Sequence, residues 1–248
     1  MERKAIYIGT SGWSYPGWIG IFYPEKIKPE QVLPCYTQTF GSVELNNSFY
    51  QVPKEKNVRK WVAMTPPDFV FSCKANRYIT HIKRLRDITD STIHLLQAFS
   101  HFEEKLGAIL FQFPPYWPLN IPVLKAFVET LPRHYLYTFE FRHQSWFCDA
   151  LYELLHQHDM SLCFYDFKTY QTPEVVTGSF IYIRMHGPNP EAYQGSYGDE
   201  TLKRCASRIS AWHNEGKPVF CYFDNDEKCC APHDALRLKT LLKPAFNP

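Results

Sequence analysis

Two hydrophobic patterns alternate along the chain, and their order predicts the fold. Short runs rich in β-branched and aromatic residues, typical of buried strands, recur through its length. These runs lie at residues 6–9, 43–46, 69–74, 108–113, 135–142, 161–166, 180–186 and 219–224. Between them lie stretches with the three-to-four-residue apolar spacing of helices. Eight strands separated by helical segments predict parallel β-α units.

The helical segments are recognised by their spacing and by signals at their ends. Ile93, Leu96 and Phe99 are spaced three apart, which predicts one apolar face within residues 92–99. A helix over residues 121–131 has Pro122 in its first turn and Pro132 directly after its end. Further helices are predicted over 146–158, 202–213 and 235–242.

The strand number and the chain length favour a closed barrel. The chain has 248 residues, a length at which single barrels are common, with no low-complexity linker and no internal repeat. We therefore expect an α/β protein with a single (β/α)8, TIM-type barrel domain over residues 1–248. An open doubly wound sheet is the alternative, but its phosphate loop is missing. The segment Gly9-Thr10-Ser11-Gly12-Trp13 matches neither the Walker pattern nor the dinucleotide fingerprint.

Composition and charge narrow the class of protein. Lys and Arg number 27 against 25 Asp and Glu, which argues against a surface-wide field for polyanions but allows a local basic patch. A hydrophobic content of 45% excludes global disorder. The 6 Trp, 16 Tyr and 19 Phe exceed what a core alone uses, so some rings are available to line a site.

The sequence predicts a cytoplasmic protein without membrane association. No apolar run reaches the roughly 18–20 residues of a membrane helix, and the start lacks a secretory apolar region. Of the 8 Cys, three fall in strand-like runs, where a thiol behaves as a small hydrophobe. Without a Cys-x-x-Cys pair, structural zinc is not expected and a reducing compartment is favoured.

Polar residues follow the apolar part of most predicted strands. In a barrel the carboxyl ends of the strands build the site, and residues two apart share a face. The polar pairs and single residues at these ends are Glu44 with Asn46, Ser72 with Lys74, Glu140 with Arg142, Arg184 with His186, and Gln112, Asp166 and Asp224. An internal ion network is the simpler explanation of any one pair. A whole ring of them costs desolvation free energy that proteins usually accept at a site, so we predict a functional site at the mouth.

Two loops add candidate binding residues. The segment 74–86 has five Lys or Arg plus His81 and directly follows the third strand. Such runs are most often solvated, but one at the site end is suited to bind phosphate or another anion. In the first β-α loop, Trp13 and Tyr15 lie among glycines. Their rings could stack on a sugar or base, or could close the end of the barrel.

A metal site is the less favoured explanation of the acidic residues. The candidate ligands are Glu44, Glu140, Asp166, His186 and Asp224. Lys74, Arg142 and Arg184 are expected at the same mouth and would repel a divalent ion, and no ligand-spacing motif is present. We therefore expect neither a metal nor another cofactor.

A series of short segments, in order over nearly the whole chain, matches the pattern of a known family. The segments are Gly9-Thr10-Ser11-Gly12-Trp13, Phe22-Tyr23-Pro24, Val43-Glu44-Leu45-Asn46, Phe49-Tyr50, Lys74-Ala75, Ile79-Thr80-His81, Gln112-Phe113-Pro114-Pro115, Glu140-Phe141-Arg142-His143 with Trp146, Tyr182-Ile183-Arg184-Met185-His186-Gly187 and Tyr222-Phe223. Together they resemble the YecE-like family, also called domain of unknown function 72. The resemblance implies a (β/α)8 barrel and supplies no established activity. At the place where the family pattern looks like Asn-Asn after Tyr-Phe, this chain has Asp224-Asn225. The difference puts in doubt any role that needs a neutral amide at position 224.

The first functional hypothesis is an enzyme, of hydrolase or isomerase type, that acts on a small anionic, phosphate-bearing substrate. Glu140 would be the general acid or base, with Glu44 as its partner and His186 as the other proton carrier. Arg142, Arg184 and Lys74 would hold the anion, and Trp13 and Tyr15 would stack on a ring. The remaining candidates for substrate binding are Asn46, Arg77, His81, Gln112 and Asp224.

Three alternatives stay open at this stage. Lys74, among cations, could form a Schiff base with a carbonyl substrate. The protein could instead be a non-catalytic nucleic-acid or nucleotide binder that uses residues 77–86 and the aromatic first loop. A protein-interaction module would need an exposed apolar patch, which a sequence does not display. The pattern also leaves the oligomeric state open.

Overall fold

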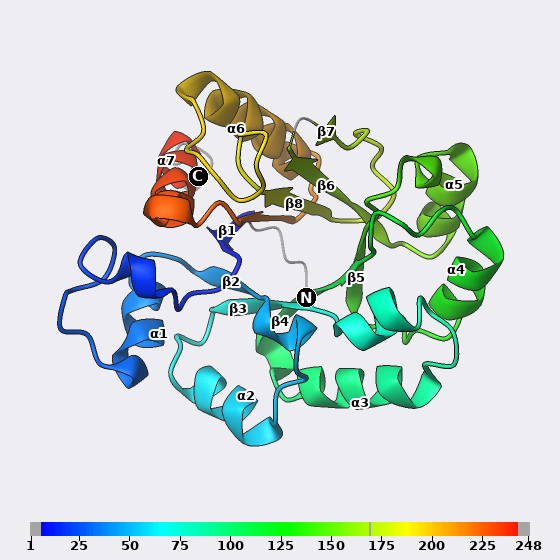
Figure 1. The fold of residues 1–248 in the computed structure, drawn as a ribbon, viewed down its shortest axis with the longest axis horizontal. Helices are drawn as coiled ribbons and strands as arrows, with labels where there is room; N and C mark the ends of the chain where they lie inside the picture. The colour runs from blue at the N-terminus through cyan, green and yellow to red at the C-terminus, as the bar shows by residue number, and fades with distance from the viewer. Residues whose placement is uncertain (1–5, 169, 243–248) are drawn as a thin grey trace.

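Eight parallel strands form a nearly closed barrel surrounded by helices (Figure 1). The structure is a computed structural model that describes residues 6–168 and 170–242. The hydrogen-bonded order of the barrel strands is β1-β9-β8-β6-β5-β4-β3-β2, and β7 pairs antiparallel with β6 beside this path. The strands are β1 Ile6–Thr10, β2 Ser42–Leu45, β3 Val70–Lys74, β4 Leu106–Gln112, β5 Leu136–Glu140, β6 Ser161–Phe167, β7 Tyr170–Gln171, β8 Ile181–Met185 and β9 Val219–Phe223. This architecture confirms the predicted α/β barrel.

Helices connect most of the strands and cover the outside of the barrel (Figure 1). They are α1 Pro29–Thr37, α2 Glu55–Ala63, α3 Thr89–Ser100, α4 Ile121–Val128, α5 Asp149–Gln157, α6 Asp199–Asn214 and α7 Cys230–Leu241. Short helical turns lie at Pro16–Trp18, Asn47–Phe49, Tyr78–Ile82, Glu103–Lys105, Gln144–Trp146 and Glu227–Cys229. Among the described residues between β6 and β8, the strand β7 stands where a regular barrel has a helix. No helix within 6–168 and 170–242 has both the length and the apolar character needed to cross a bilayer.

The strand predictions are confirmed to within two residues at each end, whereas several helix predictions need correction. Ile93 is 50% exposed, and the buried face of α3 is instead centred on Leu95 and Phe99, four residues apart. Trp146 precedes α5, because its fully buried ring belongs to a short turn and donates a hydrogen bond to the Trp117 carbonyl at 2.8 Å. The helix predicted over 121–131 ends at Val128, and the last one starts at Cys230, not at residue 235. The predicted domain 1–248 includes residues 1–5, 169 and 243–248, which lie outside the described residues.

The barrel interior is filled with rings and small side chains that form a floor beneath the strand ends. A buried cluster of Tyr182, Phe220 and Tyr222 packs with aliphatic and small residues of the neighbouring strands. The Tyr222 hydroxyl lies 2.5 Å from Ser42 Oγ and 2.9 Å from Ser72 Oγ, which links β9 to β2 and β3 across the interior. A packed interior of this kind leaves room for a ligand only at the mouth.

The seam between β1 and β2 is where the barrel is least regular. It is joined by a single bridge between Ser11 and Glu44, extended by a 2.8 Å hydrogen bond from the Gly12 amide to the Glu44 carbonyl. Gly9 allows the close approach, since a Cβ at this position would lie 2.1 Å from the Ser42 carbonyl oxygen. The absence of a side chain is therefore a steric condition for bringing the two strands together.

We predict that Gly9→Ala destabilises the protein by about 3 kcal/mol, because the strands at the seam must separate to admit the methyl group. Urea unfolding followed by circular dichroism measures the loss. Gly41→Ala is the matched control, since a Cβ there meets nothing within 4 Å. Equal stability of the two variants would contradict the steric role of Gly9.

Candidate functional site

A buried network of charges lies at the carboxyl ends of the barrel strands, centred on Arg184. This side chain is only 1% exposed, yet its guanidinium contacts three carboxylates from different parts of the barrel. Its nitrogens lie 2.8 Å from Glu44, 2.9 Å from Glu140 and 3.2 Å from Asp224. These acids come from β2, from β5 and from the residue that follows β9. The planar fork of an arginine allows one cation to bind several carboxylates at once.

Glu140 is held as an ionised carboxylate with both oxygens occupied. Its Oε1 accepts a 2.8 Å hydrogen bond from Gln112 and further hydrogen bonds from Arg142, and its Oε2 accepts from Arg184. Complete burial opposes ionisation, but the two guanidinium groups outweigh it and hold the pKa of Glu140 well below its usual range. The carboxylate therefore stays charged and serves as an acceptor for fixed donors.

His186 is fixed in one tautomer by its neighbours. Its Nε2 lies 2.8 Å from Arg142 Nη2 and 3.3 Å from Arg184 Nη1, while its Nδ1 lies 3.0 Å from Asp224 Oδ2. Guanidinium nitrogens only donate, so Nε2 must accept, and Nδ1 carries the proton that it donates to Asp224. The His186 amide also donates to Asp166 at 2.8 Å. The imidazole thus joins the two arginines to the acidic side of the mouth.

Glu44 completes the network from the opposite side of the barrel. Its Oε2 accepts a 2.6 Å hydrogen bond from the Tyr182 hydroxyl, and its Oε1 accepts one from Ser11. The three residues predicted to be catalytic, Glu44, Glu140 and His186, are therefore brought together as expected. All three are completely buried and lie beneath the cavity described next, whose lining does not include them.

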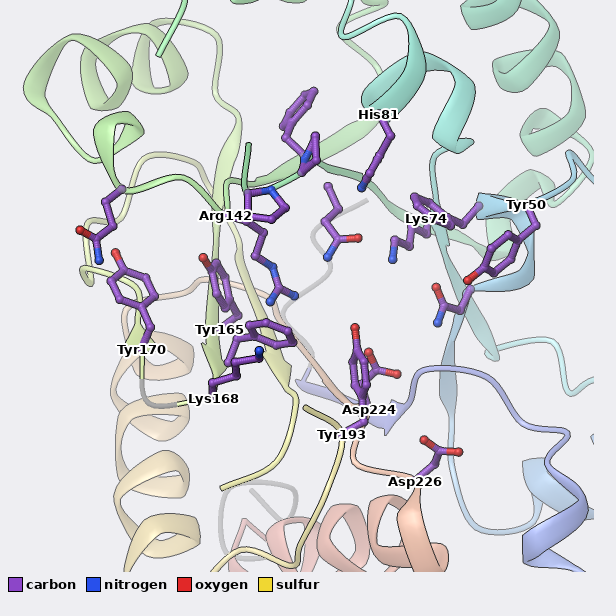
Figure 2. A pocket seen from close by; sticks show the side chains of 18 of the residues that line it. Tyr50, Lys74, His81, Arg142, Tyr165, Lys168, Tyr170, Tyr193, Asp224 and Asp226 are labelled. Atoms are coloured by element: carbon purple, nitrogen blue, oxygen red, sulfur yellow. The ribbon is translucent and has the colours of Figure 1, made fainter. Parts of the chain in front are cut away.

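A cavity of about 700 Å³ opens above this network (Figure 2). Its wall combines cationic, acidic, amide and aromatic side chains from the strand ends and the loops that follow them. The lining residues are Tyr15, Asn46, Phe49, Tyr50, Lys74, His81, Gln112, Phe113, Pro114, Pro115, Arg142, Gln144, Tyr165, Phe167, Lys168, Tyr170, Tyr193, Asp224 and Asp226. This size and composition are typical of a site for a small polar molecule.

Lys74 ends β3 with its amino group directed into the cavity (Figure 2). The residue is 7% exposed, and its Nζ lies 4.3 Å from the centroid of the Phe49 ring. Within residues 6–168 and 170–242, this ammonium group has no hydrogen-bond acceptor or ion-pair partner. Burial and then the charge of Arg184 lower the pKa of Lys74 to about 8, although Glu140, Asp224 and Glu44 act in the opposite direction.

Arg142 reaches the cavity from the other side and is held rigidly. Its guanidinium carbon lies 4.4 Å from the Tyr165 ring centroid and 4.0 Å from that of Phe167. Nε and Nη2 contact Glu140 and His186, which leaves Nη1 without an acceptor in the described part of the chain. One N–H edge of a strongly oriented guanidinium is therefore available to a ligand.

The surroundings of the cavity shift the pKa values of Asp224, Asp226 and His81 in different directions. Burial opposes ionisation of Asp224, but Arg184 and the His186 hydrogen bond prevail and lower its pKa. Burial, reinforced by Asp224, raises the pKa of Asp226. Partial burial and the nearby Lys74 and Arg77 lower the pKa of His81 to about 4, so its imidazole is neutral near pH 7. The cavity thus pairs fixed charges with groups that can exchange protons.

The predicted binding residues divide into three groups. Tyr15, Asn46, Lys74, His81, Gln112, Arg142 and Asp224 line the cavity, and Arg184 lies beneath it. Trp13 and Arg77 are not in the lining. The Trp13 ring packs edge-on against Trp61 of α2 at 5.4 Å and Phe71 of β3 at 6.3 Å, so it belongs to the packing between helix and strand, and Arg77 is exposed beside the cavity.

Several lining residues escaped the sequence analysis. Tyr165 and Phe167 share one face of β6 by their two-residue spacing, a signal that was present but hidden among the many other aromatic residues. Lys168, Tyr193 and Asp226 come from loops, and nothing in the sequence pattern marks them. Among the residues that the structure describes, no three His, Cys, Asp or Glu side chains converge in a way that could hold a metal ion.

Fold and cavity define the class of the protein, a (β/α)8-type barrel with a polar cavity at the carboxyl ends of its strands. The chain belongs to the family described as protein of unknown function DUF72, which matches residues 7–248. This membership confirms the resemblance drawn from the motifs.

Relatives and solved structures agree with the assignment. The chain is 27% identical to the UPF0759 protein YunF of Bacillus subtilis (strain 168), over 98% of this chain and 96% of YunF. It is 32% identical to the UPF0759 protein YecE of Escherichia coli (strain K12), over 57% of this chain and 50% of YecE. The crystal structure of a DUF72 family protein from Thermotoga maritima MSB8 superimposes with a TM-score of 0.82 at 28% identity, covering 96% of this chain and 99% of that one. A DUF72 family protein from Enterococcus faecalis V583, at 18% identity and a TM-score of 0.81 over 96% of this chain and 95% of that one, shares the fold.

We predict that Arg184→Met costs about 3–5 kcal/mol of stability at neutral pH, because it leaves buried carboxylates without their shared cation. Chemical denaturation at constant ionic strength measures the change. The control is Arg59→Met, which removes an exposed guanidinium from its surface pair with Glu55 and is expected to have no measurable effect. A loss no larger than that of the control would show that the network is dispensable.

We predict that Lys74→Met stabilises the protein near pH 7, by about 3 kcal/mol at most, since the pKa of Lys74 falls from 10.5 to about 8 on folding. Between these pH values the unfolded wild-type chain keeps a proton that the folded one has lost, so wild-type stability rises with pH there. The advantage of the variant is therefore greatest below pH 8 and disappears above 10.5. Unfolding as a function of pH, with exposed Lys56 changed to Met as control, tests this. A variant less stable than wild type near pH 7 would contradict it.

Proposed function

We propose that the protein is an enzyme that performs acid–base chemistry on a small, phosphate-bearing substrate bound in the cavity at the barrel mouth. The observation that carries the proposal is the state of Lys74 and Arg142. Each presents a cationic N–H group to the cavity, and neither group has an acceptor among the described residues. A largely buried cationic N–H group without an acceptor is unfavourable, and an anionic ligand between the two would offset that cost.

The rest of the cavity supports a ligand with a flat or ring-shaped part. Tyr165 and Phe167 hold Arg142 between them, and Tyr170 lies next to them, with its ring centroid 6.2 Å from that of Tyr165. Aromatic faces of this kind bind sugars, bases and other rings by stacking. Asn46, Gln112 and Gln144 could orient polar substituents, since amides both donate and accept.

Proton transfer is assigned to groups that face the cavity. Asp226 is the first candidate for a general acid or base, because it lines the cavity and because burial and Asp224 raise its pKa. Glu140, Glu44 and His186 act as positioning residues in this proposal. Glu140 and His186 hold Arg142, His186 also holds Asp224, and Glu44 holds Arg184 beneath them.

A second candidate function, nucleic-acid binding, is favoured by the segment beside the cavity. Arg77, Arg84 and Arg86 are exposed there, and Tyr78 is exposed as well. Guanidinium groups and an exposed ring are suited to phosphates and bases. The two functions differ in which cations matter, those inside the cavity or those on its outer rim.

We predict that sulfate raises the melting temperature of the wild-type protein and that Lys74→Met abolishes most of this increase, as expected for a ligand that binds only the folded state. Sulfate mimics a phosphate and keeps its charge over the pH range used. Thermal unfolding at constant ionic strength measures the effect. The binding should weaken as the pH rises through about 8, because Lys74 loses its proton there.

Arg77→Ala is the matched control, because it removes an exposed guanidinium outside the cavity. It should leave the sulfate effect unchanged. An equal sulfate effect in wild type and Lys74→Met would overturn the proposed site. If Arg77→Ala instead weakens binding of single-stranded DNA or RNA with a steep salt dependence, the second function is supported in its place.

A further inference from the structure

We propose that Lys74 is a nucleophile that forms an imine with the carbonyl carbon of a phosphate-bearing aldehyde or ketone held in the cavity. The inference rests on the proposed function and deepens it, because it names the carbonyl compounds as the substrate class. Three features of the structure support it. The Lys74 amino group lies in the cavity, it has no protein acceptor among the described residues, and other cations are available to bind the phosphate.

The backbone of Lys74 is fixed at the end of β3. Its carbonyl accepts a 2.6 Å hydrogen bond from the buried Ser48 hydroxyl, and the next amide, of Ala75, donates to the Leu110 carbonyl at 2.8 Å. The side chain is largely buried, and its amino group lies over the Phe49 ring, 4.3 Å from the centroid, where both residues line the cavity. A lysine placed in this way presents its nitrogen to a ligand with little loss of rotamer freedom.

The surroundings of Lys74 differ from those of a structural lysine in the same chain. The Lys105 ammonium group donates to the Val62 carbonyl at 2.8 Å and to the Thr65 carbonyl and hydroxyl at 2.8 and 3.0 Å. The Lys74 ammonium has none of these acceptors, so its lone pair is free whenever the proton leaves. Burial and the positive charge of Arg184 favour that loss and lower the pKa of Lys74 to about 8. Near neutral pH the amine fraction is then far larger than for an exposed lysine.

The anion has its own binding group on the opposite side of the cavity. Arg142 reaches toward the centre with one free N–H edge, and Lys168 lies on the same side (Figure 2). A free anion such as sulfate can lie between Arg142 and Lys74, whereas a larger ligand whose phosphate is held by Arg142 and Lys168 leaves the amino group of Lys74 for its carbonyl group. The aromatic wall formed by Tyr165 and Phe167 belongs to the side that holds the phosphate.

The step is balanced without an oxidant or a cofactor. The lone pair of the neutral Lys74 amine attacks the carbonyl carbon, the carbonyl oxygen takes up a proton, and the nitrogen loses one, which gives a carbinolamine. The hydroxyl group then takes a proton and leaves as water while the nitrogen lone pair forms the C=N bond. One ammonium group and one carbonyl group thus become one protonated imine and one water molecule. Asp226, the general acid or base of the proposed function, and His81 and Asp224, which are electrostatically coupled to Lys74, are the candidates to exchange these protons with solvent.

The test traps the imine with pyridoxal 5′-phosphate, which has an aldehyde, a ring and a phosphate. The protein is incubated with less than one equivalent of the probe and reduced with borohydride, and the labelled peptides are quantified by mass spectrometry. We expect Lys74 to carry at least about ten times more adduct than Lys168, an exposed lysine on the same cavity. Excess sulfate should suppress labelling of Lys74, and pyridoxal without the phosphate should label it poorly.

Lys74→Arg separates this inference from the proposed function. The variant keeps a cation but has no amine that can form an imine, so it should retain the thermal effect of sulfate and lose the preferential adduct. If the variant fails to fold, the ratio of adduct on Lys74 to adduct on Lys168 in the wild-type protein still tests the inference. Adduct on Lys74 no greater than on Lys168, in a protein that still responds to sulfate, overturns the inference and leaves the proposed function intact. A wild-type protein that sulfate does not stabilise overturns the proposed function.

Discussion

The ion cluster around Arg184 is the constraint on which the site depends. A guanidinium buried to this degree is tolerable only if carboxylates surround it, and those carboxylates are tolerable only because it is there. Glu44, Glu140 and Asp224 bring three separate parts of the barrel to one cation. The cluster therefore holds the strand ends together across the barrel and also sets the depth at which the cavity begins.

The mouth of the barrel has two layers, which differ in whether their charged donors have acceptors within the protein. In the lower layer each strong donor finds an acceptor, so Glu140 is fixed as an anion and His186 in one tautomer. In the upper layer Lys74 and one edge of Arg142 lack acceptors within the described residues. The charged groups of the lower layer are hydrogen-bonded to one another among the described residues, so this layer supplies rigidity and a fixed electric field, while the upper layer supplies contacts for a ligand.

Much of the site could be predicted because strand alternation is a local rule. Glu140 and Arg142, like Arg184 and His186, share a face of their strands, and the carboxyl ends of parallel strands must meet at one mouth. Local periodicity does not predict the direction of a side chain where that direction depends on packing against other elements. Trp13 turns away toward Trp61 and Phe71, and Ile93 lies outside the buried face of α3 because the barrel surface decides which side of that helix is covered.

The sequence by itself determined the barrel, the family and the ring of polar residues at the strand ends, since each follows from local periodicity or short motifs. Only the tertiary structure decided which of these residues face the cavity and which lie beneath it. Two positions along a strand shift a side chain by about 7 Å, enough to separate buried Glu140 from cavity-lining Arg142. Loop residues such as Lys168 and Asp226 reach the same cavity only through the path of the folded chain, which no local pattern encodes.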